Sequence, residues 1–317
     1  GKHKICVLDL INFSVNYRNT DSAFYENNLY DINNGSDIKE LEIKFNEIIE
    51  KPMVKLFDRI CDSVDEVVFT RKELITIKKY FLLQHYRTPK NKTNYTIPRQ
   101  GFKLSQYNIA EGESEEDFWK REMLTILDSK WSDLLQSEMV GVRKHAIDTN
   151  SSFMMIIKSD SEFCINDIGY VTERIPVKIA KDKEQDYIKV AKEIGKQLYG
   201  IDNFDEVARR EIANQSSYFD NFELYPISSN CAILFVDPIW KMAFLEPQII
   251  AEMNLFSPIL LKYLILPINE YVNFDKMKKQ EDIPKYMDEE DKFKYRIQKI
   301  TDDETIYLNN LTMNETY

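Results

Sequence analysis

Apolar residues in the first third of the chain recur every three or four positions, a spacing that predicts amphipathic helices. After a polar turn at residues 33–37 this pattern runs to Cys61, and Asp37 and Glu40 at its start have the spacing of a capping pair. Pro52 stands inside the pattern and has no backbone N–H to donate. We therefore expect either a kink at Pro52 or a new helix that begins at Lys51.

A second helix is predicted from Thr70, which forms a capping box with Glu73, up to Pro89, whose ring disfavours helical geometry in the residue before it. His85 falls on the apolar face of this helix. A third helix starts near Ser114. Its inward-facing positions are apolar: Phe118, Met123, Leu127, Trp131, Leu134 and Leu135.

From residue 152 onward the pattern changes to short apolar runs, which are typical of buried strands. Such runs fall within residues 153–160, 164–179, 222–238 and 293–300, with helices expected at 184–217 and after Thr301. Residues 4–10 read as a further strand, with 11–19 pairing back on it. The order of these expected helices and strands predicts one α+β domain over residues 1–317. Its helical N-terminal half (about 37–140) packs on a mixed or antiparallel sheet, formed by the C-terminal half (about 151–317) plus the N-terminal strand.

The composition narrows the class of protein. Of the 317 residues, 43% are hydrophobic, which excludes a mainly disordered chain. The net charge of -11 argues against binding nucleic acid or an anionic membrane over the whole surface. The longest apolar stretch, at 255–268, is too short to cross a bilayer, and the four scattered cysteines look like buried thiols of a reducing compartment. We therefore expect a cytoplasmic protein.

One part of this acidic chain is basic. Between Arg71 and Lys103 there are nine Lys or Arg and a single acid, Glu73. The portion after the second helix interleaves cations with aromatic rings, as segments that bind single-stranded nucleic acid do. These residues are Lys90, Lys92, Tyr95, Arg99 and Phe102. A solvated loop that lacks acids explains the same composition.

The end of the second helix carries the first candidate site. Gln84 and Arg87 are three positions apart and point the same way, and an arginine there can hold a carboxylate or phosphate with two hydrogen bonds. In the structural alternative, Arg87 caps the helix or pairs with an acid such as Glu50. His85 is a weaker ligand-binding candidate, because a lone histidine on an apolar face is typically a core residue with satisfied hydrogen bonds.

The second candidate site is Ser159 with Asp160, at the end of the buried strand predicted within 153–160. Strand ends often project polar side chains into a crevice, where Asp160 can accept hydrogen bonds, bind a metal or act as a base. An Asx turn that closes the strand is the alternative. No cofactor is predicted. With only three histidines, a metal would need mostly carboxylates, which suits Mg²⁺ or Mn²⁺.

Three motifs together resemble the large bacterial family of domains of unknown function numbered 4238. They are a helix with paired acids around Glu42 and Glu50 (LEIKFNEIIE), the helix end LLQHYRTP, and a strand that ends in Ser-Asp (IIKSD), followed later by a PISS-type turn (YPISSNCAILF). The resemblance spans nearly the whole chain. This sequence departs from the family pattern in two places: it has no His-rich HHYVP-like opening, and Ser161 and Glu162 stand where an Asn-Pro is usual.

The resemblance implies a cytoplasmic bacterial protein of a kind that often accompanies mobile elements or phage defence, and it supplies no reaction. It joins Glu50, Gln84, Arg87, Ser159 and Asp160 into one hypothesis, a shared polar cleft. We expect this cleft to bind an anionic ligand, either nucleic acid or a nucleotide, through Arg87. Asp160 and Glu50 would then serve acid–base or metal-assisted hydrolysis. The alternatives are a non-enzymatic module that recognises a protein partner, and a buried network that holds the two halves together.

Overall fold

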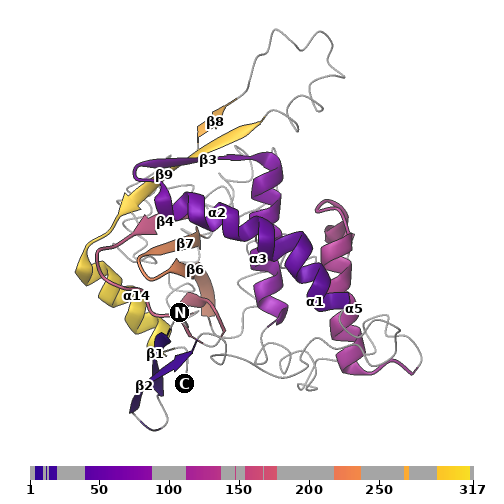
Figure 1. The fold of residues 1–317 in the computed structure, drawn as a ribbon, viewed down its shortest axis with the longest axis horizontal. Helices are drawn as coiled ribbons and strands as arrows, with labels where there is room; N and C mark the ends of the chain where they lie inside the picture. Colours follow the sequence, from indigo (N-terminus) through magenta and orange to yellow (C-terminus); the bar gives the residue numbers. More distant parts are fainter. Residues whose placement is uncertain are drawn as a thin grey trace.

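The computed structural model describes residues 4–9, 12, 14–19, 40–87, 112–136, 147, 154–166, 168–176, 218–236, 268–270 and 291–314. The helix expected at 184–217, the basic loop at 88–103 and the apolar stretch at 255–267 lie outside these residues. Helices packed on a mixed sheet make up the described structure, so the predicted α+β class is confirmed (Figure 1).

A seven-stranded sheet forms the centre of the described structure. Its order is β3, β9, β4, β7, β6 and β5, and β8 also pairs with β9. The bounds are Glu66–Thr70 for β3, Met154–Lys158 for β4, Val171–Pro176 for β5, Tyr218–Ser228 for β6, Cys231–Val236 for β7, Ile268–Glu270 for β8 and Lys292–Lys299 for β9. In this sheet β4 and β9 run parallel and the other pairs antiparallel. β3 comes from the half predicted to be helical, and its pairing with β9 joins both halves in one sheet.

The N-terminal strand does not join this sheet, which corrects the prediction. β1 (Lys4–Asp9) pairs antiparallel with β2 (Ser14–Asn19) in a separate two-stranded sheet. A local turn makes this pairing favourable, because the Asp9 carboxylate accepts hydrogen bonds from the backbone N–H and the side-chain amide of Asn12, at 3.1 and 2.9 Å. The predicted pairing of residues 11–19 back on the first strand is confirmed.

Residues 40–62 are helical throughout but change their hydrogen-bond spacing. α1 (Glu40–Lys44) leads into a π-helical stretch, η2 (Phe45–Glu50), and then into α2 (Lys51–Asp62). Pro52 accounts for the irregularity, since it cannot donate to the carbonyl four residues earlier and its ring crowds that carbonyl. A helix that begins at Lys51 is one of the two predicted outcomes.

The other two predicted helices begin at their predicted caps. At the start of α3 (Arg71–Arg87), the backbone N–H of Thr70 donates to Glu73 Oε2 at 2.8 Å, and the N–H of Glu73 donates to Thr70 Oγ at 3.3 Å. α5 (Glu115–Asp128) starts after Ser114, whose hydroxyl oxygen accepts from the N–H of Asp117 at 3.1 Å. The reciprocal bonds of a capping box satisfy backbone N–H groups that the helix itself cannot.

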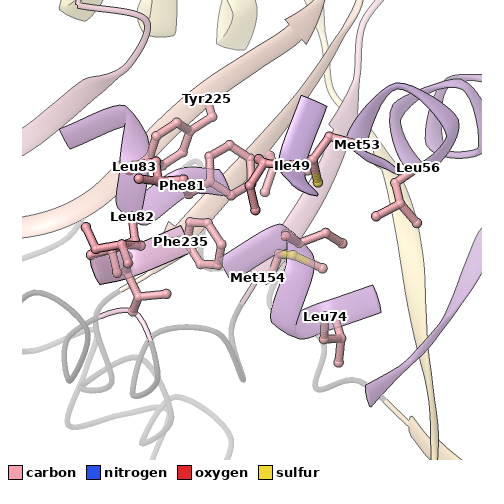
Figure 2. Packing of buried hydrophobic residues seen from close by; sticks show 14 of the residues in the cluster. Ile49, Met53, Leu56, Leu74, Phe81, Leu82, Leu83, Met154, Tyr225 and Phe235 are labelled. Atoms are coloured by element: carbon pink, nitrogen blue, oxygen red, sulfur yellow. The ribbon is translucent and has the colours of Figure 1, made fainter. Parts of the chain in front are cut away.

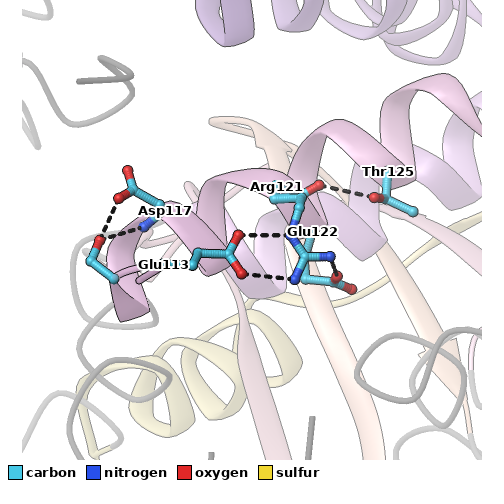
Figure 3. A network of polar contacts seen from close by, with 6 residues as sticks. Glu113, Asp117, Arg121, Glu122 and Thr125 are labelled. Carbon is cyan, nitrogen blue, oxygen red and sulfur yellow. Dashed lines mark hydrogen bonds and ion pairs between the residues drawn. The ribbon is translucent and has the colours of Figure 1, made fainter. Parts of the chain in front are cut away.

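The acidic residues 113 and 115–117 lie at this helix start, where negative charge is favoured. On the next turn, the exposed Arg121 guanidinium donates to both carboxylate oxygens of Glu113, at 2.8 and 3.1 Å, and lies 3.5 Å from Glu122 (Figure 3). The hydrogen bonds to Glu113 raise the pKa of Arg121 above its usual range. This network stabilises a solvated helix surface.

Lysine side chains satisfy carbonyl groups at two helix ends. Lys79 of α3 donates to the carbonyl oxygens of Leu127 and Ser129 at the end of α5, at 3.2 and 2.6 Å. Lys158 of β4 donates to the carbonyl oxygen of Cys61 at the end of α2, at 2.5 Å. These bonds attach each helix to its neighbour, because the last carbonyls of a helix have no partner within it.

The main core lies between the sheet and the layer of α1, η2, α2, α3 and α5. Phe81 of α3 is central to it (Figure 2). Its ring centroid is 4.2 Å from that of Tyr225 on β6 and 5.1 Å from that of Phe235 on β7. Full burial of such rings is worth about 1.5–3 kcal/mol each, so this contact holds the end of α3 firmly on β6.

The opposite face of the sheet is covered by α14 (Asp302–Asn314), the helix predicted after Thr301. The Thr305 hydroxyl donates to Ser159 Oγ at 2.6 Å, and the Tyr307 hydroxyl donates to the Glu173 carboxylate on β5. β7 is therefore buried along its whole length, which explains its uninterrupted apolar sequence.

Among the helices described, none has the length and apolar character needed to span a membrane.

Candidate functional site

The last turn of α3 brings a histidine into a buried polar network with two tyrosines and a glutamate. His85 Nδ1 lies 2.8 Å from the hydroxyl oxygen of Tyr170, and His85 Nε2 lies 2.8 Å from that of Tyr225. Tyr225 donates its hydroxyl proton to Glu223 Oε2 at 2.8 Å. We call these four residues the His85 network.

The donors and acceptors of the network fix its direction. Tyr225 has one hydroxyl hydrogen and gives it to the Glu223 carboxylate, which can only accept. In the neutral tautomer with its hydrogen on Nε2, His85 donates to Tyr225 and accepts from Tyr170 at Nδ1; Nε2 also lies 3.5 Å from Glu223 Oε2. One continuous path of hydrogen bonds thus runs from Tyr170 to the carboxylate.

Burial differs along this path. His85, Tyr225 and Glu223 are 6%, 1% and 5% exposed, whereas Tyr170 is only half-buried. Glu223 and Tyr225 lie two positions apart on β6, so both point to the face that α3 covers. Hydrogen bonds are electrostatically stronger in such an interior than in water. Tyr170 is therefore the most exposed of the four residues.

A tight loop before β5 holds Tyr170 in place. Asn166 Oδ1 accepts from the N–H groups of Ile168 and Gly169, at 3.2 and 2.9 Å, and Asn166 Nδ2 donates to the Tyr170 carbonyl oxygen at 3.0 Å. Gly169 has a φ of 83°, a conformation that other residues rarely adopt. The Tyr170 ring stacks on that of Tyr225, with centroids 5.4 Å apart at 29°.

The predicted residues Glu50, Gln84 and Arg87 also lie at this helix end, and Gln84 Oε1 is 3.7 Å from the position that a Cβ would take at Gly169, the residue before Tyr170. Arg87 donates to Glu50 Oε1 at 2.7 Å, and its guanidinium lies over the Phe45 ring at 5.3 Å from the centroid. Gln84 hydrogen-bonds Tyr80, and burial raises the pKa of that tyrosine. The ion pair with Glu50, one of the two alternatives left open by the sequence, is therefore present.

Ser159 and Asp160 do not lie beside Glu50 and Arg87. The Ser159 hydroxyl accepts from the Ser161 N–H at 3.0 Å as well as from α14, and the exposed Asp160 pairs with Lys299 at 2.8 Å. Lys158 beside them contacts the C-terminal end of α2, whereas Glu50 immediately precedes its first residue. A helix of 12 residues is about 18 Å long.

The structure therefore separates the five residues expected in one cleft. Glu50 and Arg87 are in contact, with Gln84 on the same helix end, and Ser159 with Asp160 are near the far end of α2. Asp160 and Arg87 each have an oppositely charged partner from a nearby element. The catalytic roles of Asp160 and Glu50 stay predictions. Within the described ranges, no three His, Cys, Asp or Glu side chains are grouped as metal ligands.

Sequence reasoning missed three members of the His85 network: Tyr170, Glu223 and Tyr225. One signal was available. Glu223 interrupts the apolar run on β6 between Phe222 and Leu224, and a charged residue within a buried strand is an informative exception. Nothing in the sequence assigns that carboxylate to His85, which is 138 positions earlier by the difference of their numbers (223 − 85).

Comparison with known proteins agrees with the resemblance seen in the sequence. No curated protein and no solved structure matches this chain. The family model described as "Protein of unknown function (DUF4238)" matches residues 1–317. Because this match covers the whole sequence, the chain belongs to the DUF4238 family.

Proposed function

We propose that the protein binds an anionic, phosphate-bearing ligand, a nucleotide or nucleic acid, beside Tyr170 and hydrolyses it by general-base catalysis. The observation that carries this proposal is the directed hydrogen-bond path from Tyr170 through His85 and Tyr225 to Glu223. A histidine backed by a carboxylate is a common arrangement for moving protons near neutral pH.

The path moves one proton from the water to Glu223 without leaving a charge on His85 or Tyr225. The Tyr170 oxygen takes a proton from a water bound beside the ligand, while its own hydroxyl proton passes to His85 Nδ1. The Nε2 proton of His85 passes to Tyr225, and the Tyr225 proton passes to Glu223. The water becomes a hydroxide that bonds to phosphorus as the P–O bond to the leaving group breaks; the leaving oxygen departs with that bond's electrons and takes a proton from solvent, and Glu223 ends as a neutral acid.

The charge distribution supports an anionic ligand. The sequence that follows Arg87 directly, residues 88–103, contains Lys90, Lys92, Arg99 and Lys103 and no acid. Cations close to a site attract phosphates even when the net charge of the protein is negative, because charge acts over about 10 Å at physiological salt. A divalent cation, Mg²⁺ or Mn²⁺, would enter with the ligand phosphates.

The family resemblance supports the setting that we propose: the bacterial cytoplasm, with a role in phage defence. In that setting an enzyme that degrades nucleotides or nucleic acid would act on abundant substrates. In this mechanism Tyr170 takes the proton from the water and Glu223 is the final proton acceptor. Arg87 binds the anionic ligand, and Glu50 competes with that ligand for the guanidinium.

The test compares the wild-type protein with Tyr170→Phe, which removes only the reacting hydroxyl. Both are incubated with nucleotides and single-stranded oligonucleotides in the presence of Mg²⁺ or Mn²⁺, and released products are quantified. General-base catalysis typically contributes about 10²- to 10⁴-fold, so Tyr170→Phe should reduce hydrolysis by at least about 100-fold. Equal rates for the two proteins, or no hydrolysis by the wild type, would contradict the proposal.

A second candidate function, the recognition of a protein partner, is favoured by one surface. Leu8, Val15 and Tyr17 share one face of the β1–β2 sheet and are 47%, 60% and 71% exposed. Clustered exposed apolar side chains commonly mark interaction sites. Thermal-shift measurements separate the two functions, because a ligand that binds only the folded state raises the melting temperature. If neither nucleotides, oligonucleotides nor Mn²⁺ raise the melting temperature, the result would favour the interaction module.

A further inference from the structure

Two cysteines and a lysine meet where the end of α2 contacts the sheet. Cys231, the first residue of β7, stands opposite Lys158 of β4 in the antiparallel register, which places their Cα atoms about 5 Å apart. Lys158 Nζ in turn donates to the Cys61 carbonyl oxygen in the last turn of α2. Lys158 therefore lies beside Cys231 on the sheet and contacts the backbone of Cys61 at the end of α2.

Both thiols belong to the same side of the sheet. Cys231 is part of the core beneath the helices, and Cys61 packs against that core. Cys231 is fully buried, whereas Cys61 is half-buried. Burial, with the neighbouring Cys61 thiol, raises the pKa of Cys231 to about 12, and the charge of Lys158 acts in the opposite direction. The two thiols thus differ in accessibility and reactivity.

We propose that Cys61 and Cys231 form a reversible disulfide when a peroxide oxidises Cys61. Cys61 reacts first because it is the accessible thiol of the two, and the buried thiol resolves the product. The exposures of the cysteines correct the expectation of four buried thiols, since only Cys231 is buried while Cys6 and Cys164 are exposed.

The reaction balances in two steps. The Cys61 thiolate attacks one oxygen of hydrogen peroxide, the O–O bond breaks, and a sulfenic acid forms while the departing hydroxide takes up a proton to become water. The Cys231 sulfur then attacks the Cys61 sulfur, the S–O bond breaks, and the released hydroxide takes the Cys231 proton. In total, two thiols are oxidised, one peroxide is reduced, and two waters form.

The disulfide would link the end of α2 to the start of β7. β7 pairs with β6, the strand that carries Glu223 and Tyr225. Disulfides of cytosolic proteins are typically transient and redox-sensing. Oxidation would therefore fasten a helix of the covering layer to the sheet that holds the His85 network.

The test treats the intact wild-type chain with hydrogen peroxide, blocks remaining thiols with an alkylating reagent, and maps the linked peptides by mass spectrometry without reduction. We expect a Cys61–Cys231 linked pair, lighter than the two free peptides by about 2 Da, that dithiothreitol reverses. The double variant Cys6→Ser/Cys164→Ser is the matched control and should give the same pair. In Cys231→Ser, a sulfenic acid at Cys61 should be trapped by a cyclic 1,3-dione.

Three results would overturn the proposal. Cys61 could stay reduced at peroxide concentrations that oxidise Cys164; it could be oxidised to a sulfinic acid with Cys231 still free; or the linked pair could be Cys6 with Cys164. None of these outcomes depends on hydrolysis or on ligand binding. The thiol proposal therefore stands or fails separately from the proposed function.

Discussion

His85 on α3 and Tyr225 on β6 are joined by a 2.8 Å hydrogen bond in the protein interior, between residues that are 140 positions apart in the chain. The bond ties the covering helix layer to the sheet, and Tyr225 in turn donates to Glu223. The group of atoms that stabilises this contact is thus also the group through which we propose that protons move.

Removing the imidazole should destabilise the protein. His85→Leu leaves the Tyr225 hydroxyl oxygen without its buried donor, and such losses cost about 1–3 kcal/mol. We expect a lower urea midpoint with an unchanged slope. In the double variant His85→Leu/Tyr225→Phe, both partners are apolar, so the loss of stability should be smaller than the sum of the two single losses. A fully additive double variant would contradict the direct contact.

Glu223→Gln should separate stability from proton transfer. The amide oxygen can still accept from Tyr225, so we expect the melting temperature to change little. An amide cannot serve as the final proton acceptor, so hydrolysis should fall by at least about 100-fold. Circular dichroism and the product assay with oligonucleotides measure the two effects on one sample. A variant that loses its fold and its activity together would instead assign Glu223 a structural role.

Arg87 and Glu50 should behave as a partly solvated pair. Their side chains are 22% and 38% exposed, so Arg87→Ala should cost about 1 kcal/mol from the lost ion pair and the contact with Phe45. Urea denaturation measures this loss. A loss of several kcal/mol would support the alternative of a buried network that holds the two halves together.

Glu50→Gln should strengthen anion binding, because the amide competes less well than a carboxylate for the Arg87 guanidinium. Inorganic phosphate is a suitable probe, with binding measured by calorimetry at low salt. We expect tighter binding by Glu50→Gln than by the wild type. Asp58→Asn, which removes one exposed acid of α2, serves as the charge control and should bind phosphate as the wild type does.

The capping box of α3 should make stability depend on pH. Burial alone would raise the pKa of Glu73, but its hydrogen bonds to Arg59 and Thr70 outweigh burial, and the net pKa lies below the ordinary value of 4.5. The unfolded chain therefore binds this proton first, so the contribution of Glu73 is present above pH 4.5 and is lost as the pH falls through the lower, folded-state value. Glu73→Gln should be less stable than the wild type at pH 7, and the difference should shrink on acidification. A difference that grows on acidification would contradict this assignment.

The sequence was informative about elements whose signals are local. The capping box at Thr70 and Glu73, the cap at Ser114 and the helix start before Pro52 all depend on residues a few positions apart, and the structure has all three. The apolar strand before Ser159 is equally local, because its near-continuous hydrophobic run reflects burial on both faces.

Long-range pairings were not predictable in the same way. β3 shows a short apolar run that a neighbouring helix signal overshadows, and only its pairing with β9, more than 200 positions later, makes it part of the sheet. The hairpin of β1 could not be told from a strand of the main sheet, since both read as an apolar run. The His85 network combines one strand, a loop and a helix, and no spacing in the sequence encodes that meeting.

The most direct measurement of the central claim is the hydrogen-bonding state of the His85 ring, read from nitrogen-15 NMR spectra of the wild-type protein and of Tyr170→Phe. We expect a neutral ring with its hydrogen on Nε2 and with Nδ1 accepting a hydrogen bond. In Tyr170→Phe the Nδ1 signal should shift, because it loses its donor, while Nε2 stays protonated. A wild-type ring with its hydrogen on Nδ1 and a bare Nε2 would contradict the path to Glu223 and the function proposed from it.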